Sequence, residues 1–246
     1  MRQFGLIGKS LRHSFSQTYF TQKFHNLDIT DCRYDLFEIP SISELPDLVR
    51  ANPDLVGLNV TIPYKEQVWP YLDEVSPTAA RIGAVNTIEF AEDGRLIGHN
   101  TDYLGFRESL RSFYPHTGEQ AGALVLGTGG SSKAVEAALR ELDIRYLLVS
   151  RSPLNLALTY EELSLEIIKA HSLIINTTPL GTYPNVAECP PIPYEFLTPQ
   201  HYLFDLIYNP RETLFLDKGR EAGAQIKNGF EMLGFQAEAA WEIWNR

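Results

Sequence analysis

The residues best placed to do chemistry form a glycine-rich segment, Gly-Thr-Gly-Gly-Ser-Ser-Lys, at positions 127–133. An apolar run precedes this segment, and an alanine-rich run that predicts a helix follows it. Backbone amides and a helix N-terminus can hold a pyrophosphate at such a junction. Ser132 takes the third glycine position of the G-x-G-x-x-G pattern, so the segment predicts a dinucleotide site of a looser type, with a ligand-free turn as the alternative. The residues that would bind are Gly127, Thr128, Gly129 and Gly130.

The end of the following strand indicates which dinucleotide would fit. An NAD site is expected to carry Asp or Glu there for the ribose hydroxyls. This sequence instead has Ser150, Arg151 and Ser152, and a guanidinium between two hydroxyls suits a 2′-phosphate. The pattern favours NADP, although an isolated arginine is more often a solvated surface residue.

A second polar group lies in the first half of the chain. Asn59 and Thr61 are two positions apart, so on a strand both point to one face while their apolar neighbours point to the other. That face can form the wall of a ligand site. Pro63 predicts the end of this strand and the start of a helix, which places Lys65 in the first helical turn. The helix dipole disfavours a cation there. Lys65 therefore has a functional interpretation beside that of an ordinary surface lysine.

Three more polar residues have both a structural and a functional interpretation. Asp102 follows a polar corner and opens a predicted helix, where its charge suits the helix dipole. Ser14 and Ser16 flank an aromatic residue ahead of another predicted helix. In isolation, helix capping is the simpler interpretation of this serine pair.

Two α/β segments must position these residues. In the first, short apolar runs alternate with helical patterns, and Asp93-Gly94 predicts a hairpin turn. In the second, continuous apolar runs are typical of a parallel sheet covered on both faces. The predicted strands are 4–7, 33–39, 55–62, 84–90, 96–98, 123–126, 146–149, 173–176, 202–207 and 225–227. The predicted helices are 16–24, 41–49, 102–114, 133–142, 160–170 and 229–244.

Composition limits the classes of partner. The 246 residues carry 21 Lys and Arg against 31 Asp and Glu, and the net charge of −10 repels nucleic acid and anionic membrane surfaces. No run approaches the roughly 18 apolar residues of a membrane span, and the N-terminus lacks a signal-peptide pattern. Cys32 and Cys189 form no disulfide framework, and none of the six histidines has metal-ligand spacing. We therefore expect a cytoplasmic protein with no metal, nucleic-acid partner or membrane anchor.

Taken together, the motifs resemble those of the shikimate dehydrogenase family across nearly the whole chain. The matching segments are 14–16, 59–65, 83–87, 98–102 with 105–106, 127–130, 150–152, 176–178, 205–210 and 232–237. The resemblance implies an α/β fold with an N-terminal α/β substrate-binding catalytic domain, 1–101 completed by the C-terminal helix 229–246. A Rossmann-like, doubly wound NADP-binding domain would span 102–228. The implied activity is that of an NADP-dependent oxidoreductase interconverting 3-dehydroshikimate and shikimate in aromatic amino-acid biosynthesis.

The resemblance also assigns roles by position. Lys65 and Asp102 would form the catalytic pair, as hydride transfer needs a proton source beside the reacting oxygen. Ser14 and Ser16 would hold the substrate carboxylate, with Tyr208 near it. The ring hydroxyls would be bound by Asn59, Thr61, Asn86 and Gln236, together with the catalytic pair. The cofactor would be bound by Gly127, Thr128, Gly129, Gly130, Ser150, Arg151, Ser152 and Thr177.

This sequence departs from the family where the adenosine would bind. The family commonly has Asn-Arg-Thr at 150–152, and the segment that follows here is short, so we expect it to lack one helix and one short strand. One alternative function is a quinate or dual quinate/shikimate dehydrogenase, against which the two serines argue. The other is a catalytically silent metabolite-binding regulator, against which the retained Lys65 and Asp102 argue. The expected partner is a small-molecule substrate, and the expected state is a monomer or a homodimer.

Overall fold

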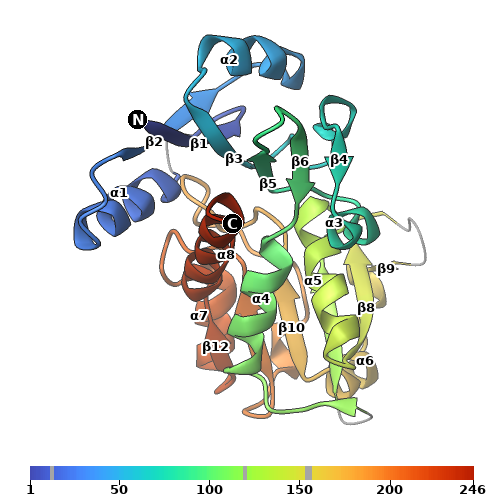
Figure 1. Ribbon diagram of the computed structural model, residues 1–246. Coiled ribbons are helices and arrows are strands. Elements are labelled where there is room, and N and C mark those ends of the chain that lie inside the picture. Colours follow the sequence, from blue (N-terminus) through green and yellow to red (C-terminus); the bar gives the residue numbers. More distant parts are fainter. Residues whose placement is uncertain (12–13, 119–120, 153–156) are drawn as a thin grey trace. The chain divides into compact units, whose positions relative to one another are not determined.

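The computed structural model describes residues 1–11, 14–118, 121–152 and 157–246. Its strands form two six-stranded sheets (Figure 1). One sheet belongs to a unit formed by Met1–Thr101 and Gln236–Arg246, and the other to a unit formed by Asp102–Phe235. The last helix, α8 (Phe230–Trp244), contributes to both units, whereas the sequence analysis assigns all of 229–246 to the first.

The sheet of the first unit is mixed, with the strand order β2-β1-β3-β5-β6-β4. Strand β1 pairs in parallel with β2 and β3, and β5 runs antiparallel to β3 and β6. The strands are β1 (Arg2–Gly8), β2 (Cys32–Glu38), β3 (Leu55–Val60), β4 (Glu74–Val75), β5 (Thr87–Phe90) and β6 (Leu96–His99). The helices are α1 (Ser16–Asn26), α2 (Leu45–Ala51) and α3 (Pro77–Ile82).

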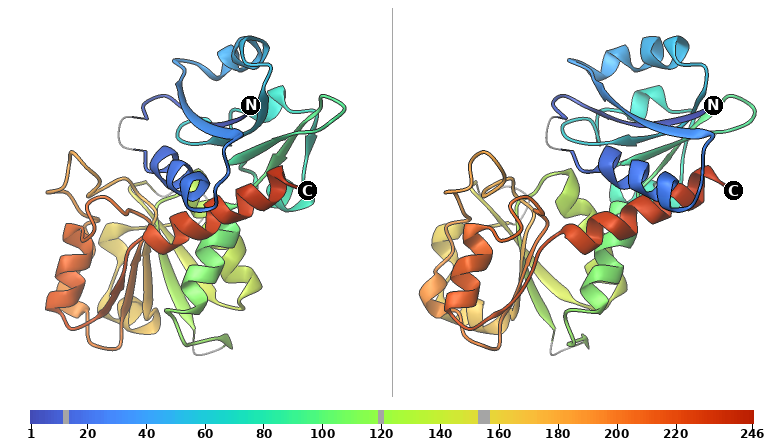
Figure 2. Two further views of the ribbon diagram at one scale, coloured as in Figure 1. Left: turned by 60° about the vertical axis from the view of Figure 1, so that its left-hand side comes forward. Right: turned by 90° about the vertical axis from the view of Figure 1, so that its left-hand side faces the viewer.

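Each face of this sheet has its own apolar core. On one face, Phe4 of β1 packs with Phe20 and Phe24 of α1 and with Ala240 of α8. On the other face, apolar residues of β1, β3 and β5 pack with Leu45 of α2. Figure 2 shows α1 and the end of α8 side by side on one face, and α2 on the opposite one. A strand residue between two members of the α2-side core therefore points toward α1.

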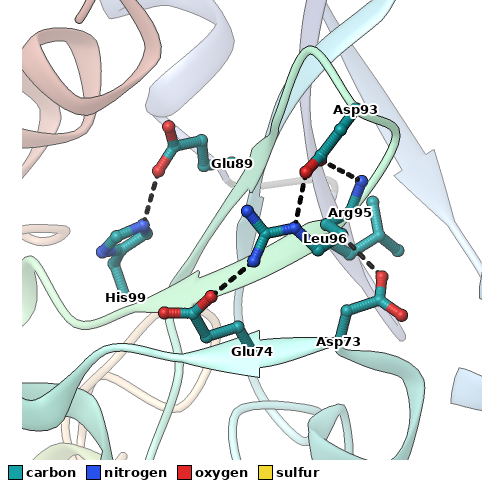
Figure 3. Close-up of polar contacts among 7 residues, drawn as sticks. All are labelled: Asp73, Glu74, Glu89, Asp93, Arg95, Leu96 and His99. Carbon is teal, nitrogen blue, oxygen red and sulfur yellow. Dashed lines mark hydrogen bonds and ion pairs between the residues drawn. The ribbon is translucent and has the colours of Figure 1, made fainter.

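A charged cluster holds the β5–β6 hairpin in register (Figure 3). The Arg95 guanidinium contacts Asp93 Oδ2 and Glu74 Oε2, each at 2.7 Å, and so ties the hairpin to the edge strand β4. Near the other end of the hairpin, His99 Nε2 lies 2.8 Å from Glu89 Oε2. The Arg95 pairs are exposed, and exposed ion pairs contribute little to stability. Their effect is to fix the end of β6, from which residues 100–101 continue.

The sheet of the second unit is parallel throughout, with the order β12-β11-β10-β7-β8-β9. Its strands are β7 (Gly122–Leu126), β8 (Arg145–Ser150), β9 (Leu158–Thr159), β10 (Leu173–Asn176), β11 (Tyr202–Asp205) and β12 (Gln225–Lys227). Its helices, besides the start of α8, are α4 (Asp102–Arg111), α5 (Gly130–Glu141), α6 (Leu165–Ala170) and α7 (Leu214–Glu221). Figure 2 shows α4 on one face of the sheet and α7 on the other.

The strand order reverses between β7 and β10, since the chain runs outward from β7 to β8 and β9 and then returns to β10 on the other side of β7. In open parallel sheets, ligands bind outside the carboxyl ends of the strands at such a switch point. The glycine-rich segment follows β7 and Thr177 follows β10, so both flank this point.

The predicted α/β class and the Rossmann-like sheet are confirmed, as are all the predicted strands to within a few residues. The predicted hairpin turn is confirmed by Gly94, whose φ of 86° suits glycine. The expected loss of a short strand after residue 152 is wrong, because β9 pairs with β8 and completes the sheet. Within the described residues, none of the helices is both long and apolar enough to cross a bilayer.

The helix predicted to start at Pro63 is also absent. Residues 62–68 form consecutive turns that lead into a 3-10 helix at Trp69–Tyr71. The cause is Tyr64, which is 2% exposed and donates its hydroxyl to the Ile39 carbonyl oxygen at 2.6 Å. This buried anchor pulls the segment onto the sheet, so Lys65 lies in a turn and experiences no helix dipole.

Candidate functional site

Four buried polar side chains lie at one end of the first sheet, and we call them the polar wall: Asn59, Asn86, Thr87 and Thr101. Asn59 of β3 pairs with Thr87 of β5, Asn86 precedes Thr87, and Thr101 follows β6. Each is at most 5% exposed. Asn59 Nδ2 donates to Thr87 Oγ1 at 3.2 Å, and Asn86 Nδ2 donates to Thr101 Oγ1 at 3.0 Å. Buried amides and hydroxyls are stable only when hydrogen-bonded, so this network fixes a rigid surface of neutral donors and acceptors.

The predicted orientation of Asn59 is confirmed. Its neighbours Leu58 and Val60 belong to the apolar core on the α2 side. On the opposite face, Tyr34 donates its hydroxyl to Asn59 Oδ1 at 2.8 Å. Thr61 lies just beyond the strand, and its amide donates to the Ile7 carbonyl oxygen at 3.0 Å.

The backbone of Lys65 is attached to the polar wall. The amide of Val85, the residue before Asn86, donates to the Lys65 carbonyl oxygen at 2.8 Å. The turn that carries Lys65 is therefore fixed against the start of β5. The lysine side chain is partly buried.

The two serines open helix α1, which begins at Ser16. The Ser16 amide donates to Ser14 Oγ at 3.3 Å, but the N-cap residue of α1 is Phe15 and no side chain caps the helix, so the capping interpretation of the serines is wrong. A hydroxyl that accepts such a bond can still donate its proton to a ligand. Gln236, also in the first unit, lies on α8 beside Ala237 of the α1-side core and is 8% exposed.

In the second unit, Asp102 is the first residue of α4 and is 8% exposed, as the predicted helix start requires. Tyr208 follows β11 and is partly exposed. The loop that carries Tyr208 is organised by Asp205, whose Oδ1 accepts from the Ile207 amide at 3.0 Å. Asp205 Oδ2 accepts from Thr213 Oγ1 at 2.5 Å, so one carboxyl holds both ends of the loop.

Asp205 also ties this loop to the neighbouring strand. Asn176 Nδ2, at the end of β10, donates to Asp205 Oδ1 at 3.1 Å. Burial raises the pKa of the Asp205 carboxyl to about 7, although the bonds from Thr213, Ile207 and Asn176 oppose the rise. The folded protein therefore keeps this acid protonated at pH values where the unfolded chain has lost the proton.

Stability is expected to depend on pH through Asp205. An unfolded Asp titrates near pH 4, so between about pH 4 and 7 the unfolded state binds fewer protons and the free energy of unfolding falls as pH rises. Asp205→Asn mimics the neutral acid and should remove this fall. Urea unfolding of both proteins at pH 5 and pH 8 checks it: the loss of stability should be smaller in the variant. An equal loss in both would mean that Asp205 ionises without cost.

The glycine-rich segment of the second unit has the geometry of a phosphate cradle. Gly127 has a φ of 108°, and a Cβ on it would lie 2.8 Å from Thr177 Oγ1. A Cβ on Gly129 would meet nothing within 4 Å, so the space beside this residue is open. Gly129 caps the N-terminus of α5, where the first amides of a helix have no partner within the helix. These residues fit a pyrophosphate.

Two further residues support this cradle from within the protein. Ser132 is 1% exposed and donates to the Gly129 carbonyl oxygen at 2.7 Å, so the residue in the third glycine position braces the loop. Thr177 donates its hydroxyl to the Leu126 carbonyl oxygen at 2.7 Å, which holds the end of β10 against the end of β7.

The two residues after strand β8 show the exposure expected of a phosphate contact. Ser150 ends the strand and pairs with Thr159 of β9, while Arg151 and Ser152 are exposed. The Ser152 amide lies 3.4 Å from Ser150 Oγ. A guanidinium in this setting can turn toward an anion without first breaking a buried contact.

Sequence patterns give no role to Thr87, Thr101 or Tyr34. Thr87 and Thr101 are fully buried, but a threonine in or near a strand ordinarily indicates only β propensity. Tyr34 lies in an alternating strand, where an aromatic residue ordinarily belongs to the core. The two threonines carry one signal, since each directly follows an asparagine within a segment that resembles the family, 83–87 or 98–102.

Comparison with known proteins places these features in a family. Residues 6–88 match the family model described as the shikimate dehydrogenase substrate binding domain. The shikimate dehydrogenase (NADP(+)) of Clostridium beijerinckii is 41% identical over 256 residues, which cover 99% of this chain and 92% of that protein.

Solved structures agree with this assignment. Shikimate 5-dehydrogenase from Thermus thermophilus, in complex with NADP(H) and shikimate, has a TM-score of 0.86 and 31% identity and covers 99% of this chain and 93% of its own. Quinate dehydrogenase from Corynebacterium glutamicum, in complex with NAD, also has a TM-score of 0.86, with 25% identity and the same coverage of 99% and 93%.

Proposed function

We propose a reaction for this protein from one premise: the chain belongs to the shikimate dehydrogenase family. The reaction is the NADP-dependent interconversion of 3-dehydroshikimate and shikimate. One observation carries the proposal, namely the polar wall, which lies within and beside the residues that match the substrate-binding model. A substrate with several ring hydroxyls needs neutral donors and acceptors in fixed positions, and a buried hydrogen-bonded surface supplies them.

Polar side chains are assigned to the binding of each part of the substrate. The ring hydroxyls bind to Asn59, Thr61, Asn86 and Gln236. The carboxylate binds the hydroxyls of Ser14 and Ser16, with Tyr208 close to it. Support for the serine assignment comes from helix α1, because its N-terminus begins at Ser16 and its dipole favours an anion there.

Proton transfer is assigned to Lys65 and Asp102. The Lys65 ammonium donates a proton to the ketone oxygen as that oxygen becomes a hydroxyl, and takes it back in the reverse direction. The Asp102 carboxylate holds the ammonium in place. Two facts support the pairing: the Lys65 carbonyl is bonded to the residue before Asn86, and Asp102 follows Thr101 in the chain.

The cofactor contacts are assigned to the second unit. NADP, when bound, supplies or accepts the hydride. Residues 127–130 and the N-terminus of α5 would hold its pyrophosphate, with Thr177 bracing them. Ser150, Arg151 and Ser152 would hold the 2′-phosphate. The named cofactor of the Clostridium beijerinckii and Thermus thermophilus proteins supports the choice of NADP.

Absorbance of NADPH provides the test of this function. The purified protein should consume NADPH with 3-dehydroshikimate and form it from shikimate and NADP. Absence of turnover in both directions, with shikimate still bound, would favour a catalytically silent regulator.

Quinate is the second candidate substrate, because the Corynebacterium glutamicum quinate dehydrogenase shares this fold. Turnover of quinate without turnover of shikimate would make that enzyme the better description. Turnover of both would indicate a dual dehydrogenase. The serines at 14 and 16 favour shikimate over quinate.

Replacing Ser14 and Ser16 together by Ala is expected to raise the KM for shikimate by about 10-fold or more, because two hydrogen bonds to a charged carboxylate are lost. The KM for NADP should not change, since the glycine-rich segment belongs to the other unit. Steady-state kinetics with each substrate varied in turn provides the measurement. An unaltered KM for shikimate would remove both serines from the site.

We also propose a cytoplasmic location for the protein. Cys32 and Cys189 are both free thiols, as is usual in a reducing cytoplasm. The chain is proposed to act as a monomer or a homodimer, and light scattering of the purified protein distinguishes the two.

A further inference from the structure

Tyr34 connects the two groups of residues that would hold opposite ends of the substrate. We propose that Tyr34 is a positioning residue: its phenol orients the Asn59 amide, and its ring and backbone hold the start of α1, where the two serines lie. This inference rests on the proposed function, since it concerns how that substrate is bound. Tyr34 itself is 3% exposed and is not assigned to touch the substrate.

The direction of each hydrogen bond around Asn59 follows from the partners. Asn59 Nδ2 lies 3.3 Å from the Asn86 carbonyl oxygen and 3.2 Å from Thr87 Oγ1. A carbonyl oxygen only accepts, so the amide nitrogen must face it and the amide oxygen must face Tyr34. The phenol therefore gives its one proton to Asn59 Oδ1, at 2.8 Å.

This orientation fixes what Asn59 offers to a ligand. Both of its N–H groups point to protein acceptors, whereas its oxygen has a second lone pair. Asn59 thus presents an acceptor to a substrate hydroxyl. Without the Tyr34 proton, the amide oxygen would lose the partner that defines its position, and the specificity of the wall for a hydroxyl donor would weaken.

Two contacts tie Tyr34 to the start of α1. Gln17 Nε2 donates to the Tyr34 carbonyl oxygen at 3.1 Å, and the Phe20 ring stacks on the phenol ring with centroids 4.5 Å apart and an interplanar angle of 9°. The two serines lie where this helix begins, so Tyr34 also helps to hold their backbone in place.

Burial raises the pKa of Tyr34 far above its ordinary value, which keeps the phenol a donor to Asn59. Removal of the phenol oxygen should therefore disturb the Asn59 end of the substrate site, while the stacked ring and the main chain of Tyr34 still hold the start of α1.

The test is Tyr34→Phe in the full chain, which removes only the hydroxyl. The KM for shikimate should rise by about 5- to 10-fold, the scale for a buried acceptor left without its donor, with kcat changed less than twofold and the KM for NADP unchanged. A merely structural role would lower stability, but it would not raise the KM for shikimate while leaving kcat and the KM for NADP nearly unchanged.

Tyr114→Phe is the matched control. Tyr114 is also buried, at 5% exposed, its hydroxyl lies 2.7 Å from Ser172 Oγ, and it belongs to the second unit. It should lose similar thermal stability and keep the wild-type KM for shikimate. In an Asn59→Ala background, Tyr34→Phe should have a smaller effect on the KM for shikimate than in the wild type, because the bond between the two side chains is already lost.

The outcomes separate the two proposals. Wild-type protein without turnover of shikimate would overturn the proposed function and this inference with it. Active wild type with an unchanged KM for shikimate in Tyr34→Phe, or with equal KM changes in the Tyr34 and Tyr114 variants, would overturn only the positioning role. Should Tyr34→Phe prove unstable, the increase in its melting temperature on addition of shikimate can be measured instead. An increase as large as that of the wild type would overturn the positioning role, and a smaller increase would support it.

Discussion

Replacing Lys65 by Ala is expected to lower kcat for shikimate oxidation by about 100-fold or more, the usual scale for loss of acid–base assistance. The turn that carries Lys65 should survive, because its main-chain carbonyl, not its side chain, accepts the bond from Val85. Loss of the ammonium leaves the reacting oxygen without its proton partner and leaves Asp102 without its cation. Steady-state kinetics at saturating substrate and NADP measures the effect on kcat.

Two variants sharpen the measurement. Lys65→Arg keeps the positive charge but holds its proton too tightly to exchange it, so its kcat should stay near that of the Ala variant. Lys169→Ala removes an exposed lysine from α6 and should keep full activity. A Lys65→Ala enzyme within twofold of the wild-type kcat would show that Lys65 is an ordinary surface lysine.

Local signals account for most of what the sequence predicts about the fold. The glycine-rich segment and the Asp93-Gly94 turn each act within a few residues, so their structures follow from their own chemistry. Helix α7 escapes prediction because Gly219 lies in its interior, where glycine ordinarily disfavours a helix. The structure explains this glycine: a Cβ there would lie 2.4 Å from Leu203 Cδ2, so close packing of α7 on β11 requires it.

Helix α3 is not predicted for a different reason, which is its short length. Ser76 caps it through a bond from the Ala79 amide, Pro77 is its first residue, and Gly83 ends it with a φ of 76°. All three are recognised start and stop signals. The helix has only six residues, too few to show the apolar period from which helices are predicted.

The polar wall illustrates why the site is only partly predictable. Motifs single out Asn59 and Asn86, but the bonds that orient them come from Thr87, Thr101 and Tyr34. These bonds exist because β3 lies between β1 and β5 and because β2 lies beside β1. Strand order is set by the packing of the whole unit, so no pattern within one segment reveals which buried hydroxyl meets which amide.

Replacing Arg151 by Ala is expected to weaken NADP binding by about 10- to 150-fold, which corresponds to the loss of roughly 1.5 to 3 kcal/mol for a charge-assisted contact. NAD binding should be nearly unchanged, so the preference between the two dinucleotides narrows. Titration of the wild type and the variant with each dinucleotide, by fluorescence or calorimetry at one salt concentration, measures both affinities.

The physical reason lies in the charge of the ligand and of the protein. A 2′-phosphate adds nearly two negative charges to the dinucleotide, and the protein already carries a net charge of −10. Arg151 provides a cation at the end of β8 in a planar fork that can make two bonds to one phosphate. Ser150 and Ser152 add neutral donors beside it, and no carboxylate stands among these three residues to bind a ribose hydroxyl instead.

The matched control is Arg145→Ala. Arg145 is also exposed and lies on the same strand, but at its amino end, whereas Arg151 follows the carboxyl end. At about 3.3 Å per residue, the two positions are roughly 20 Å apart, beyond the screening length at physiological salt. Both variants lose one positive charge, so a general effect of net charge would lower NADP affinity equally in both. A loss confined to Arg151→Ala and to NADP identifies a phosphate contact, whereas an equal loss for NAD and NADP in that variant would mean that Arg151 supports the fold and does not discriminate between them.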